Sequence, residues 1–328
     1  MAARSSVIVI TLNRPDCIRR CLECLERQEP LPDQIIVVDA SPDDVTTKIV
    51  AEFPGVLYLR NESGFGRMTT SRNIALKHST GDIIAFVDDD AFAHPGWLAA
   101  LLATYTAPET GAVGGRALNN VPGEATRGVD KIGKLTPYGL LEGNFGADPG
   151  KTLSVDHIIG CNMSFRREVL ARLGGFREDF PGFSSLCEDS DMSLRVRKLG
   201  YTILFNPEAV VDHIGAPQAK GKRFDVSYSY NEQRNRMVML ISNYGLFSHY
   251  VPGCFVYSLW RRTYSLGRFL HGLRPGLTAV AHWGATAAGM PVGVALGVRF
   301  RLQHQGDPVR HDPDAVQIVQ ILSESVKT

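Results

Sequence analysis

The run from Ile83 to Asp90, IIAFVDDD, constrains this chain more than any other segment. Its five apolar residues predict a short strand buried on both faces, which is typical of the parallel sheet of an α/β protein. Three carboxylates follow at the carboxyl end of this strand, where open α/β sheets bind their ligands. Adjacent anions repel each other, and a divalent cation with oxygen ligands relieves that repulsion. We therefore expect Asp88 and Asp90 to hold a cation and the phosphates of a nucleotide. The alternative is an acidic turn that caps a helix beginning near Pro95.

Segments typical of strands and of helices alternate through the first half of the chain. This alternation predicts an α/β fold with a doubly wound, mostly parallel sheet. The expected strands span residues 7–12, 34–39, 56–60, 83–88, 113–117, 155–165 and 202–205. The expected helices span residues 17–28, 46–53, 71–78, 97–105, 167–173 and 190–198. Residues 119–152 are rich in Gly and Pro and are expected to form a long loop.

The formal net charge of +1 hides an uneven distribution. Residues 220–301 contain 11 Lys and Arg against only Asp225 and Glu232, a balance of +9 that leaves −8 for the remainder. The same segment is rich in Tyr, Phe and Trp. Basic and aromatic residues together suit an anionic membrane surface better than single-stranded nucleic acid, so we expect no nucleic-acid partner. The chain is expected to divide into an α/β domain over residues 1–218 and a helical region over residues 219–328.

Residues 277–298 form a stretch of 22 residues without a formal charge. That length approaches what a helix needs to span a bilayer. The stretch is dominated by Ala and Gly and contains His282 and Pro291, whereas a spanning helix needs more large apolar residues. Packing on the α/β domain, or lying in the membrane interface, is therefore favoured over spanning.

Six cysteines are too few for a disulfide scaffold in 328 residues, and no secretory signal is recognisable before the strand expected from Val7. Cys17, Cys21 and Cys24 share one face of the helix expected over residues 17–28. The spacing of Cys21 and Cys24 leaves redox or metal chemistry open, but a stripe of core-facing cysteines is the favoured interpretation. We expect a reducing, cytoplasmic setting.

The ends of the expected strands, taken in order, resemble an inverting family 2 glycosyltransferase of the GT-A fold over residues 5–215. Three separated motifs carry the resemblance. They are TLNR at 11–14 with VVD at 37–39, the segment 66–90 with SRN at 71–73 and DDD at 88–90, and GCNMS at 160–164 followed by CEDSD at 187–191. The resemblance implies a Rossmann-like, GT-A type sheet and a nucleotide-sugar donor. The chain departs from the family pattern at Ala40, where a glycine is usual before Ser41.

Residues at the ends of the first two strands are expected to bind the nucleoside of the donor. Thr11, Asn13 and Arg14 lie in the loop after the first strand, which can touch a nucleoside. Asp39 ends the second strand, and a carboxylate there can accept the imide N–H of a uracil or thymine ring. The resemblance assigns that role to Asp39, with Ser41 beside it. A turn cap next to Pro42 is the alternative for this carboxylate.

Arg67, Arg72 and Asn73 lie at a Gly-rich entry to a helix. The N-terminus of a helix with an arginine nearby favours phosphate. The resemblance implies that Arg72 and Asn73 hold the nucleotide or the metal-binding loop. The alternative is that Arg72 is a solvated surface residue.

The resemblance also implies a cation, Mn²⁺ or Mg²⁺, at the carboxylate run. Asp90 would bind the cation directly, and Asp88 would contact the ribose or a metal-bound water. Asp89, between them, is expected to be a minor contributor to donor binding. His213 follows a strand-like segment, and in the family a histidine at this place often completes the metal ligands. A hydrogen-bonded scaffold histidine is the alternative.

Glu188 and Asp189 form a second carboxylate cluster at the start of an expected helix. An inverting transfer needs a base that takes the proton of the acceptor hydroxyl, and a carboxylate placed there can do so. We expect Asp189 to be this base, with Glu188 beside it. An acidic helix N-terminus that complements the helix dipole is the alternative. Asp191 is expected to contact the acceptor or to pair with Arg195.

Gly160, Cys161 and Asn162 are candidates for contact with the acceptor, because small residues let backbone groups approach a ligand. The sequence thus predicts a metal-dependent inverting glycosyltransferase that moves a sugar from a UDP- or dTDP-linked donor to a hydroxyl acceptor. The acceptor would be a lipid-linked glycan at the inner face of the cell membrane, or a natural product. A nucleotidyltransferase and a non-catalytic module that binds nucleotide sugars are the rival hypotheses.

Overall fold

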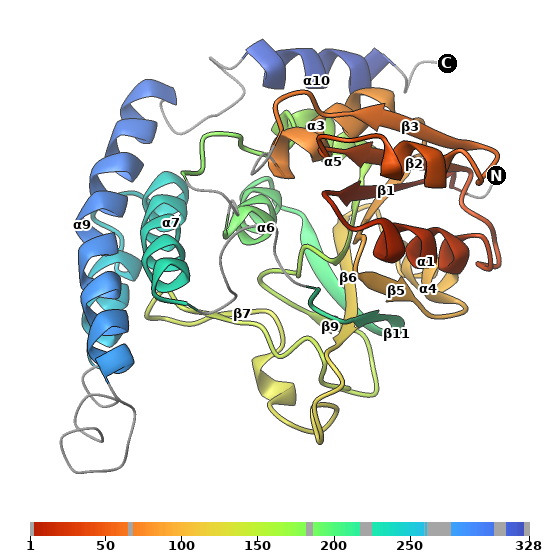
Figure 1. The fold of residues 1–328 in the computed structure, drawn as a ribbon. Coiled ribbons are helices and arrows are strands. Elements are labelled where there is room, and N and C mark those ends of the chain that lie inside the picture. The colour runs from red at the N-terminus through yellow and green to blue at the C-terminus, as the bar shows by residue number, and fades with distance from the viewer. Residues whose placement is uncertain are drawn as a thin grey trace.

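A twisted, mostly parallel sheet occupies the centre of the molecule, and helices cover it (Figure 1). The computed structural model describes residues 3–64, 68–181, 186–216, 225–258, 260, 277–304 and 313–324. The strand order in the main sheet is β3-β2-β1-β4-β10-β6-β11-β5, with β9 paired to β11. This order confirms the doubly wound α/β fold that the alternating sequence pattern predicts.

The first four strands after the N-terminus run parallel to one another. They are β1 (Ser5–Thr11), β2 (Gln34–Asp39), β3 (Val56–Arg60) and β4 (Ile83–Asp88). The residues that end β1, β2 and β4 therefore meet at one edge of the sheet, since Thr11 pairs with Asp39 and Ile10 with Asp88. This register places the predicted functional residues of distant segments together.

The remaining strands extend the sheet beyond β4. They are β5 (Ala91–Ala93), β6 (Thr110–Leu118), β9 (Leu153–Ser154), β10 (Asn162–Arg166) and β11 (Thr202–His213). Strand β10 is antiparallel to both β4 and β6, while β6 and β11 are parallel. Strand β11 joins the expected strand at 202–205 to the strand-like segment before His213, across an irregularity that contains Pro207. A proline fits there because it cannot donate a ladder hydrogen bond.

The helices of the α/β part agree with the predicted segments to within a few residues. They are α1 (Pro15–Leu25), α2 (Val45–Val50), α3 (Met68–His78), α4 (Trp97–Ala103), α5 (Arg167–Leu173) and α6 (Glu188–Lys198). Cys21 on α1 is 1% exposed and belongs to the core, whereas Cys17 and Cys24 are half-buried. The core-facing interpretation of this cysteine stripe is therefore supported most strongly at Cys21.

The loop expected over residues 119–152 contains short ordered elements. A 3₁₀ turn, η1 (Val129–Lys131), precedes a two-stranded ribbon made of β7 (Lys134–Leu135) and β8 (Leu141–Glu142). Two-residue strands carry too little alternation to be recognised in a sequence. Backbone bonds from Asp156 and His157 to the carbonyl of Gly133 tie this segment to the approach to β10.

Helices α7 (Val226–Tyr244) and α9 (Leu277–His304) pack along each other beside the sheet (Figure 1). Three glycines of α9 face α7 at very close range. A Cβ on Gly289 would lie 2.7 Å from the carbonyl oxygen of Tyr230, and one on Gly293 would lie 2.4 Å from the carbonyl oxygen of Arg234. A Cβ on Gly297 would lie 2.9 Å from Cβ of Ile241. Residues four apart lie on one helix face, so the glycines form a stripe that allows this close approach. The high Gly content of residues 277–298 therefore serves helix packing. No helix in the described segments combines the length and apolar character that crossing a bilayer requires.

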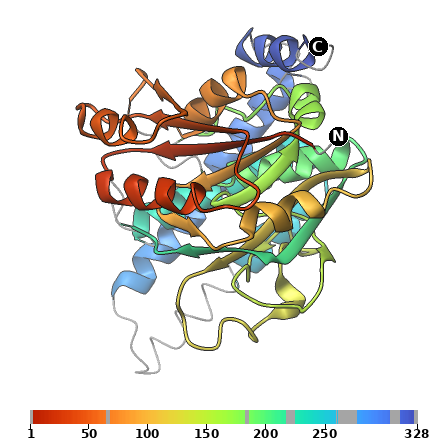
Figure 2. The same ribbon diagram turned by 90° about the vertical axis from the view of Figure 1, so that its right-hand side faces the viewer.

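The last described helix, α10 (Pro313–Glu324), lies over α3 and α5 (Figures 1 and 2). Its side chains Ile318 and Leu322 are fully buried and belong to the same hydrophobic cluster as the central strands. The helical C-terminal part of the chain thus includes a helix that is packed into the core of the α/β part. The division at residue 218 stays a prediction.

Candidate active site

The three consecutive aspartates lie at the end of the central strand β4. Asp88 is its last residue, and Asp89 and Asp90 form the turn into β5. Asp89 and Asp90 are buried, while the Asp88 side chain keeps 26% of its surface exposed. The alternative that these carboxylates cap the next helix is wrong, because Gly96 precedes α4 and no side chain caps it.

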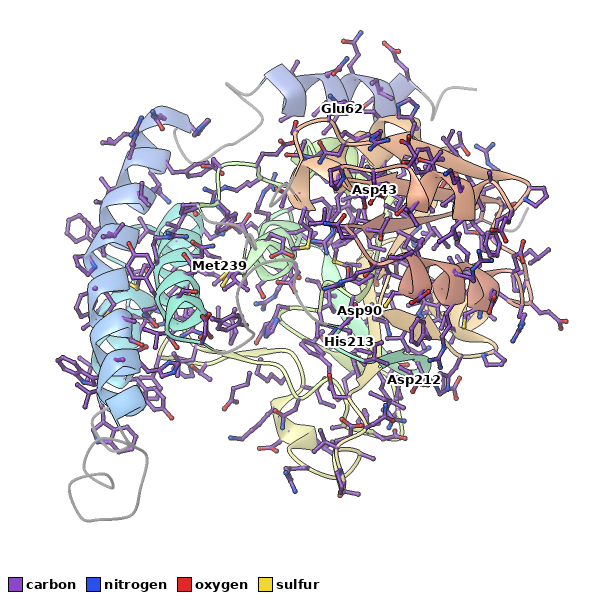
Figure 3. The ribbon with its side chains drawn as sticks, in the orientation of Figure 1. Asp43, Glu62, Asp90, Asp212, His213 and Met239 are labelled. Carbon is purple, nitrogen blue, oxygen red and sulfur yellow. The ribbon has the colours of Figure 1, made fainter. Side chains whose placement is uncertain are left out.

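Asp88, Asp90 and His213 converge at the edge of the sheet. One ligand atom from each lies within 4.8 Å of the others, and the described residues form no other such group of three or more His, Cys, Asp or Glu. Figure 3 shows His213, from the end of β11, beside Asp90. Nε2 of His213 lies 3.7 Å from Oδ1 of Asp90, while Nδ1 lies 3.3 Å from Oδ1 of Asn119. Two carboxylates and one imidazole form a donor set that fits Mn²⁺ or Mg²⁺.

The backbone after β11 fixes Asp90 in this cluster. The N–H of Ala216 donates to Oδ2 of Asp90 at 2.8 Å, and the N–H of Ile214 donates to its carbonyl at 3.1 Å. Asp212 points away from the cluster, as alternation along a strand requires, and its Oδ1 lies 3.1 Å from Nε2 of His94 (Figure 3). Asp212 is therefore a natural control carboxylate for Asp90.

Asp89, expected to be a minor contributor, is an anchor for the site. Its Oδ2 accepts a bond from the Thr11 hydroxyl at 2.7 Å, and its Oδ1 accepts one from Nη1 of Arg14 at 2.8 Å. Burial raises the pKa of Asp89 to about 7, against the opposing effect of Arg14. Nη1 of Arg14 also lies 3.3 Å from Oδ2 of Asp90. Thr11 and Arg14, both predicted donor-site residues, thus hold the aspartate turn from the end of β1.

The predicted nucleoside-binding residues form a connected loop at the ends of β1 and β2. Asp39 is fully buried and accepts bonds from the N–H of Ser41 at 2.8 Å and from the Tyr58 hydroxyl at 3.0 Å. The Ser41 hydroxyl accepts a bond from the N–H of Asn13 at 2.8 Å, and Asn13 is exposed with a φ of 54°. The hydrogen bond from the Ser41 N–H to the Asp39 carboxylate is the turn cap that the sequence offered as the alternative to nucleoside binding. The structure therefore supports the cap and leaves nucleoside contact as a prediction.

Arg72 is buried between the two carboxylate clusters. It is 1% exposed, so the alternative of a solvated surface residue is wrong. Its Nη1 donates to Oε1 of Glu188 at 2.9 Å, and its Nη2 lies 3.6 Å from Oδ1 of Asp88. The guanidinium also stands over the ring of Phe176 at 5.2 Å. Arg72 therefore joins the end of β4 to the start of α6.

The neighbours of Arg72 in the second predicted motif, the segment 66–90, have different positions. Asn73 is buried, and its amide exchanges hydrogen bonds with the backbone of Phe176 and donates to Oε1 of Glu178. This amide thus holds α3 to the chain that follows α5, and a direct contact with the donor stays a prediction. Arg67 lies outside the described residues.

Glu188 and Asp189 begin α6 but lie in different surroundings. Glu188 is 7% exposed and is held by Arg72. Burial, followed by the neighbouring Asp189 charge, raises the pKa of Glu188 to about 8, and Arg72 opposes this rise. Asp189 is half-buried, and its Oδ2 accepts a bond from the N–H of Gly160 at 2.9 Å. Of the two carboxylates, Asp189 is the one that a substrate can reach.

The other predicted acceptor residues are mostly enclosed. Cys161 is 2% exposed. Asn162 is fully buried, and its amide bonds Trp97 and the carbonyls of Arg116 and Ala209. Gly160 alone adjoins Asp189, and a Cβ at this position would lie 3.4 Å from Oδ2 of that carboxylate. Contact of Cys161 and Asn162 with an acceptor stays a prediction that their burial does not favour.

Asp191 lies within the interface between α6 and α7. It is 1% exposed, and its Oδ1 accepts a bond from the Asn243 amide at 2.7 Å and lies 3.4 Å from Nη1 of Arg177. Nη1 of Arg195 lies 4.0 Å from its Oδ2. These contacts support the structural role that was one of two predictions for this residue.

Sequence reasoning passed over two residues beside Asp189. The Ser190 hydroxyl lies 3.2 Å from Oδ1 of Asp189 and 3.3 Å from Nδ1 of His157. His157 is 4% exposed and comes from the loop before β10. No sequence pattern connects His157 to α6, because only the fold brings these segments together.

Residues 6–174 match the family model described as Glycosyl transferase family 2. The chain is 28% identical over 221 residues to a glucosyl-dolichyl phosphate glucuronosyltransferase of Haloferax volcanii, a match that covers 63% of this chain and 68% of that protein. It is 26% identical over 191 residues to the O-antigen chain rhamnosyltransferase WbaN of Salmonella anatum, with 57% and 58% covered. The matched regions thus span about three fifths to two thirds of these relatives.

Solved structures with a similar fold include a named glycosyltransferase. A mannosyltransferase of Pyrobaculum calidifontis, solved with GDP-Man and Mn²⁺, superimposes with a TM-score of 0.56 at 20% identity over 100% of this chain and 87% of that one. Residues 1–349 of S. aureus TarS give a TM-score of 0.57 at 17% identity over 99% and 91%. These similarities show the GT-A fold. With more than half of its length matched by the family model, the chain belongs to glycosyltransferase family 2 and is a glycosyl-transferring enzyme.

Proposed function

We propose that this chain is a metal-dependent inverting glycosyltransferase that moves a sugar from a UDP- or dTDP-linked donor to a hydroxyl acceptor. The observation that carries the proposal is the convergence of Asp88, Asp90 and His213 at the carboxyl end of β4. Ligands of α/β proteins bind at this edge of the sheet. Mn²⁺ in the structure of the Pyrobaculum mannosyltransferase supports a cation in the same fold.

Asp88, Asp90 and His213 would hold Mn²⁺ or Mg²⁺. When bound, such a cation neutralises negative charge on the diphosphate leaving group. Arg14 adds a fixed positive charge beside the aspartates, because Asp89 and Asp90 hold its guanidinium. The loop of Thr11, Asn13 and Ser41 and the nearby Asp39 would position the nucleoside.

Asp189 would act as the general base. One of its oxygens takes the proton of the acceptor hydroxyl while that hydroxyl oxygen forms a bond to the anomeric carbon. The bond from the anomeric carbon to the diphosphate breaks on the opposite face, and its electron pair leaves with the diphosphate. The N–H of Gly160 orients the carboxylate at 2.9 Å, and Arg72 engages Glu188, so that Asp189 remains accessible.

A lipid-linked acceptor at a membrane surface fits the C-terminal part of the chain. Phe247, Val256 and Trp260 expose 97%, 70% and 61% of their surfaces, within a segment that is basic overall. The Haloferax relative is named for a lipid-linked substrate. We expect binding to vesicles that contain phosphatidylglycerol and release by salt. Equal binding to neutral phosphatidylcholine vesicles would contradict the electrostatic part of this expectation.

The central test is a screen of nucleotide sugars for thermal stabilisation with and without Mn²⁺, because a ligand of the native state raises the unfolding midpoint. We expect a UDP- or dTDP-sugar to stabilise the wild type only when Mn²⁺ is present. Asp90→Asn is expected to lose this stabilisation, whereas the matched control Asp212→Asn is expected to retain it. Metal-independent stabilisation by every donor, or equal loss in both variants, would refute the proposed site.

Catalysis is tested separately from binding. Asp189→Asn is expected to bind donor and Mn²⁺ as the wild type does but to lose transfer, because only the base is removed. Full transfer by this variant would refute the assignment of the base. Binding without any release of nucleoside diphosphate by the wild type would support the rival hypothesis of a non-catalytic module.

A further inference from the structure

A buried chain of hydrogen-bonding groups leads from Asp189 into the protein. Oδ1 of Asp189 lies 3.2 Å from the Ser190 hydroxyl, and that hydroxyl lies 3.3 Å from Nδ1 of His157. Nε2 of His157 lies 3.2 Å from the carbonyl oxygen of Glu142 on β8. The His157 ring also meets the ring of Phe145 edge to face at 5.5 Å. The imidazole is thus enclosed and has a polar partner at each nitrogen.

The partners of His157 determine which nitrogen carries the proton. A backbone carbonyl can only accept, so Nε2 must be the protonated nitrogen. In the neutral ring Nδ1 is then an acceptor, and the Ser190 hydroxyl must donate to it. A hydroxyl has one proton, so in this state Oδ1 of Asp189 receives no bond from the Ser190 hydroxyl and keeps only the bond from the Ser190 backbone N–H at 2.6 Å.

The neutral state of the ring is favoured by its surroundings. Burial lowers the pKa of His157, against the opposing charges of Asp189 and Asp156 and the carbonyls of Glu142 and Lys134. A protonated ring would instead donate from Nδ1 to the Ser190 oxygen. The serine proton would then be free to bond Asp189, and a hydrogen bond to a carboxylate makes it a weaker base.

We propose that His157 is a positioning residue that keeps the Ser190 proton away from Asp189 and so preserves Asp189 as a strong base. The inference rests on the proposed function, since it assumes that Asp189 takes the acceptor proton. It assigns a role to His157, which lies outside the motifs of the family resemblance, and to Ser190, which stands in the 187–191 motif but had no predicted role. Neither His157 nor Ser190 needs to touch the substrate.

Kinetics of His157→Gln test this role. Gln can keep the bond to the Glu142 carbonyl through its amide nitrogen, but it leaves the position of Nδ1 empty, so the Ser190 hydroxyl turns to Asp189. We expect kcat to fall by up to about tenfold, because an added hydrogen bond makes the Asp189 carboxylate a weaker base, with an unchanged KM for the donor. In a Ser190→Ala background the same change should alter kcat less than about twofold, because no serine proton remains. His94→Gln, outside the site, is the matched control and should not alter kcat.

The assay measures release of nucleoside diphosphate from UDP-glucose, UDP-N-acetylglucosamine, dTDP-rhamnose and GDP-mannose with Mn²⁺ and water as acceptor. A similar loss of kcat from His157→Gln in both backgrounds would indicate a purely structural histidine and would overturn the inference. Unfolding midpoints of all variants identify any that fail to fold.

A measurement that needs no turnover tests the inference independently of the proposed function. Imidazole ¹⁵N shifts of the wild type, assigned with His157→Gln, should show the Nε2–H tautomer of His157 at neutral pH. Asp189→Asn should move the titration of His157 to lower pH, because the carboxylate that favours the charged ring is gone. An Nδ1–H tautomer, or no response to Asp189→Asn, would overturn the hydrogen-bonded chain. Absence of turnover with every donor would instead refute the proposed function.

Discussion

Glu188 provides the sharpest test of the electrostatics at the start of α6. The side chain is 7% exposed, and burial, followed by the charge of Asp189, raises its pKa from 4.5 to about 8 despite Arg72. In the unfolded chain this carboxyl ionises near its ordinary value. Between about pH 4.5 and pH 8 the folded protein therefore binds more protons at Glu188 than the unfolded chain does, and the free energy of unfolding falls as the pH rises.

The isosteric change Glu188→Gln removes this pH dependence. One pKa unit corresponds to about 1.4 kcal/mol, so the rise from 4.5 to about 8 costs at most about 5 kcal/mol at high pH. The stability of the variant relative to the wild type should therefore increase with pH by up to about 1.4 kcal/mol per unit and level off above about pH 8. The Gln side chain can still accept the hydrogen bond from Arg72. The Arg72 guanidinium also keeps a charged neighbour in the variant, because its Nη2 lies 3.6 Å from Oδ1 of Asp88.

Denaturant unfolding of both proteins between pH 5 and pH 9 measures this difference. Glu208→Gln, at an exposed site, is the control and should change stability by no more than about 0.5 kcal/mol. A Glu188→Gln variant that is less stable than the wild type by a constant amount at every pH would refute the reasoning. That result would mean that Arg72 keeps Glu188 ionised in the folded protein throughout.

Three further substitutions test the site and its support. Asp90→Asn should lower turnover about a hundredfold or more, measured as release of nucleoside diphosphate, because a negative ligand is lost; normal turnover would exclude Asp90 from the metal site. Gly160→Ala should lower kcat about tenfold without unfolding the protein, because its Cβ would lie only 3.0 Å from Nη2 of Arg72 and would also touch Oδ2 of Asp189 at 3.4 Å; unchanged kinetics would show that the positions of these two groups are not critical. Trp97→Phe should cost about 2 kcal/mol in denaturant unfolding, because the fully buried Asn162 loses the indole N–H at 2.9 Å; a neutral effect would indicate that another donor replaces it.

The sequence predicts the fold well where local patterns carry the information. The strands at 34–39, 56–60 and 83–88 begin and end as expected, because runs of apolar residues between polar turns mark a buried strand. Two-residue strands such as β7 and β8 carry no comparable local signal, and the sequence does not show that the strand at 202–205 and the strand-like segment before His213 join into one strand, β11, across Pro207. They form because neighbouring segments offer hydrogen-bond partners.

In the candidate site, too, local sequence patterns predict some features, whereas contacts between distant segments decide others. The convergence of Asp88 and His213 follows from strand ends that motifs identify, and the structure brings the two side chains together. The predicted roles of Asp39 and Asp89 were incomplete, because a sequence does not show that Tyr58 or Arg14 already occupies their oxygens. Burial of Arg72 was equally hidden, since its partners come from β4 and α6.

The sequence by itself determined which strand ends carry carboxylates, because the two-residue period of a strand and the parallel order of the sheet are local and repetitive properties. Only the tertiary structure decided which charges are paired, which are buried and which remain open to a substrate. The link from Asp88 through Arg72 to Glu188, and the contact of His157 with Ser190, join residues far apart in the chain. Such pairings depend on distances in space and on the exclusion of water, and no repeating sequence pattern reports either property.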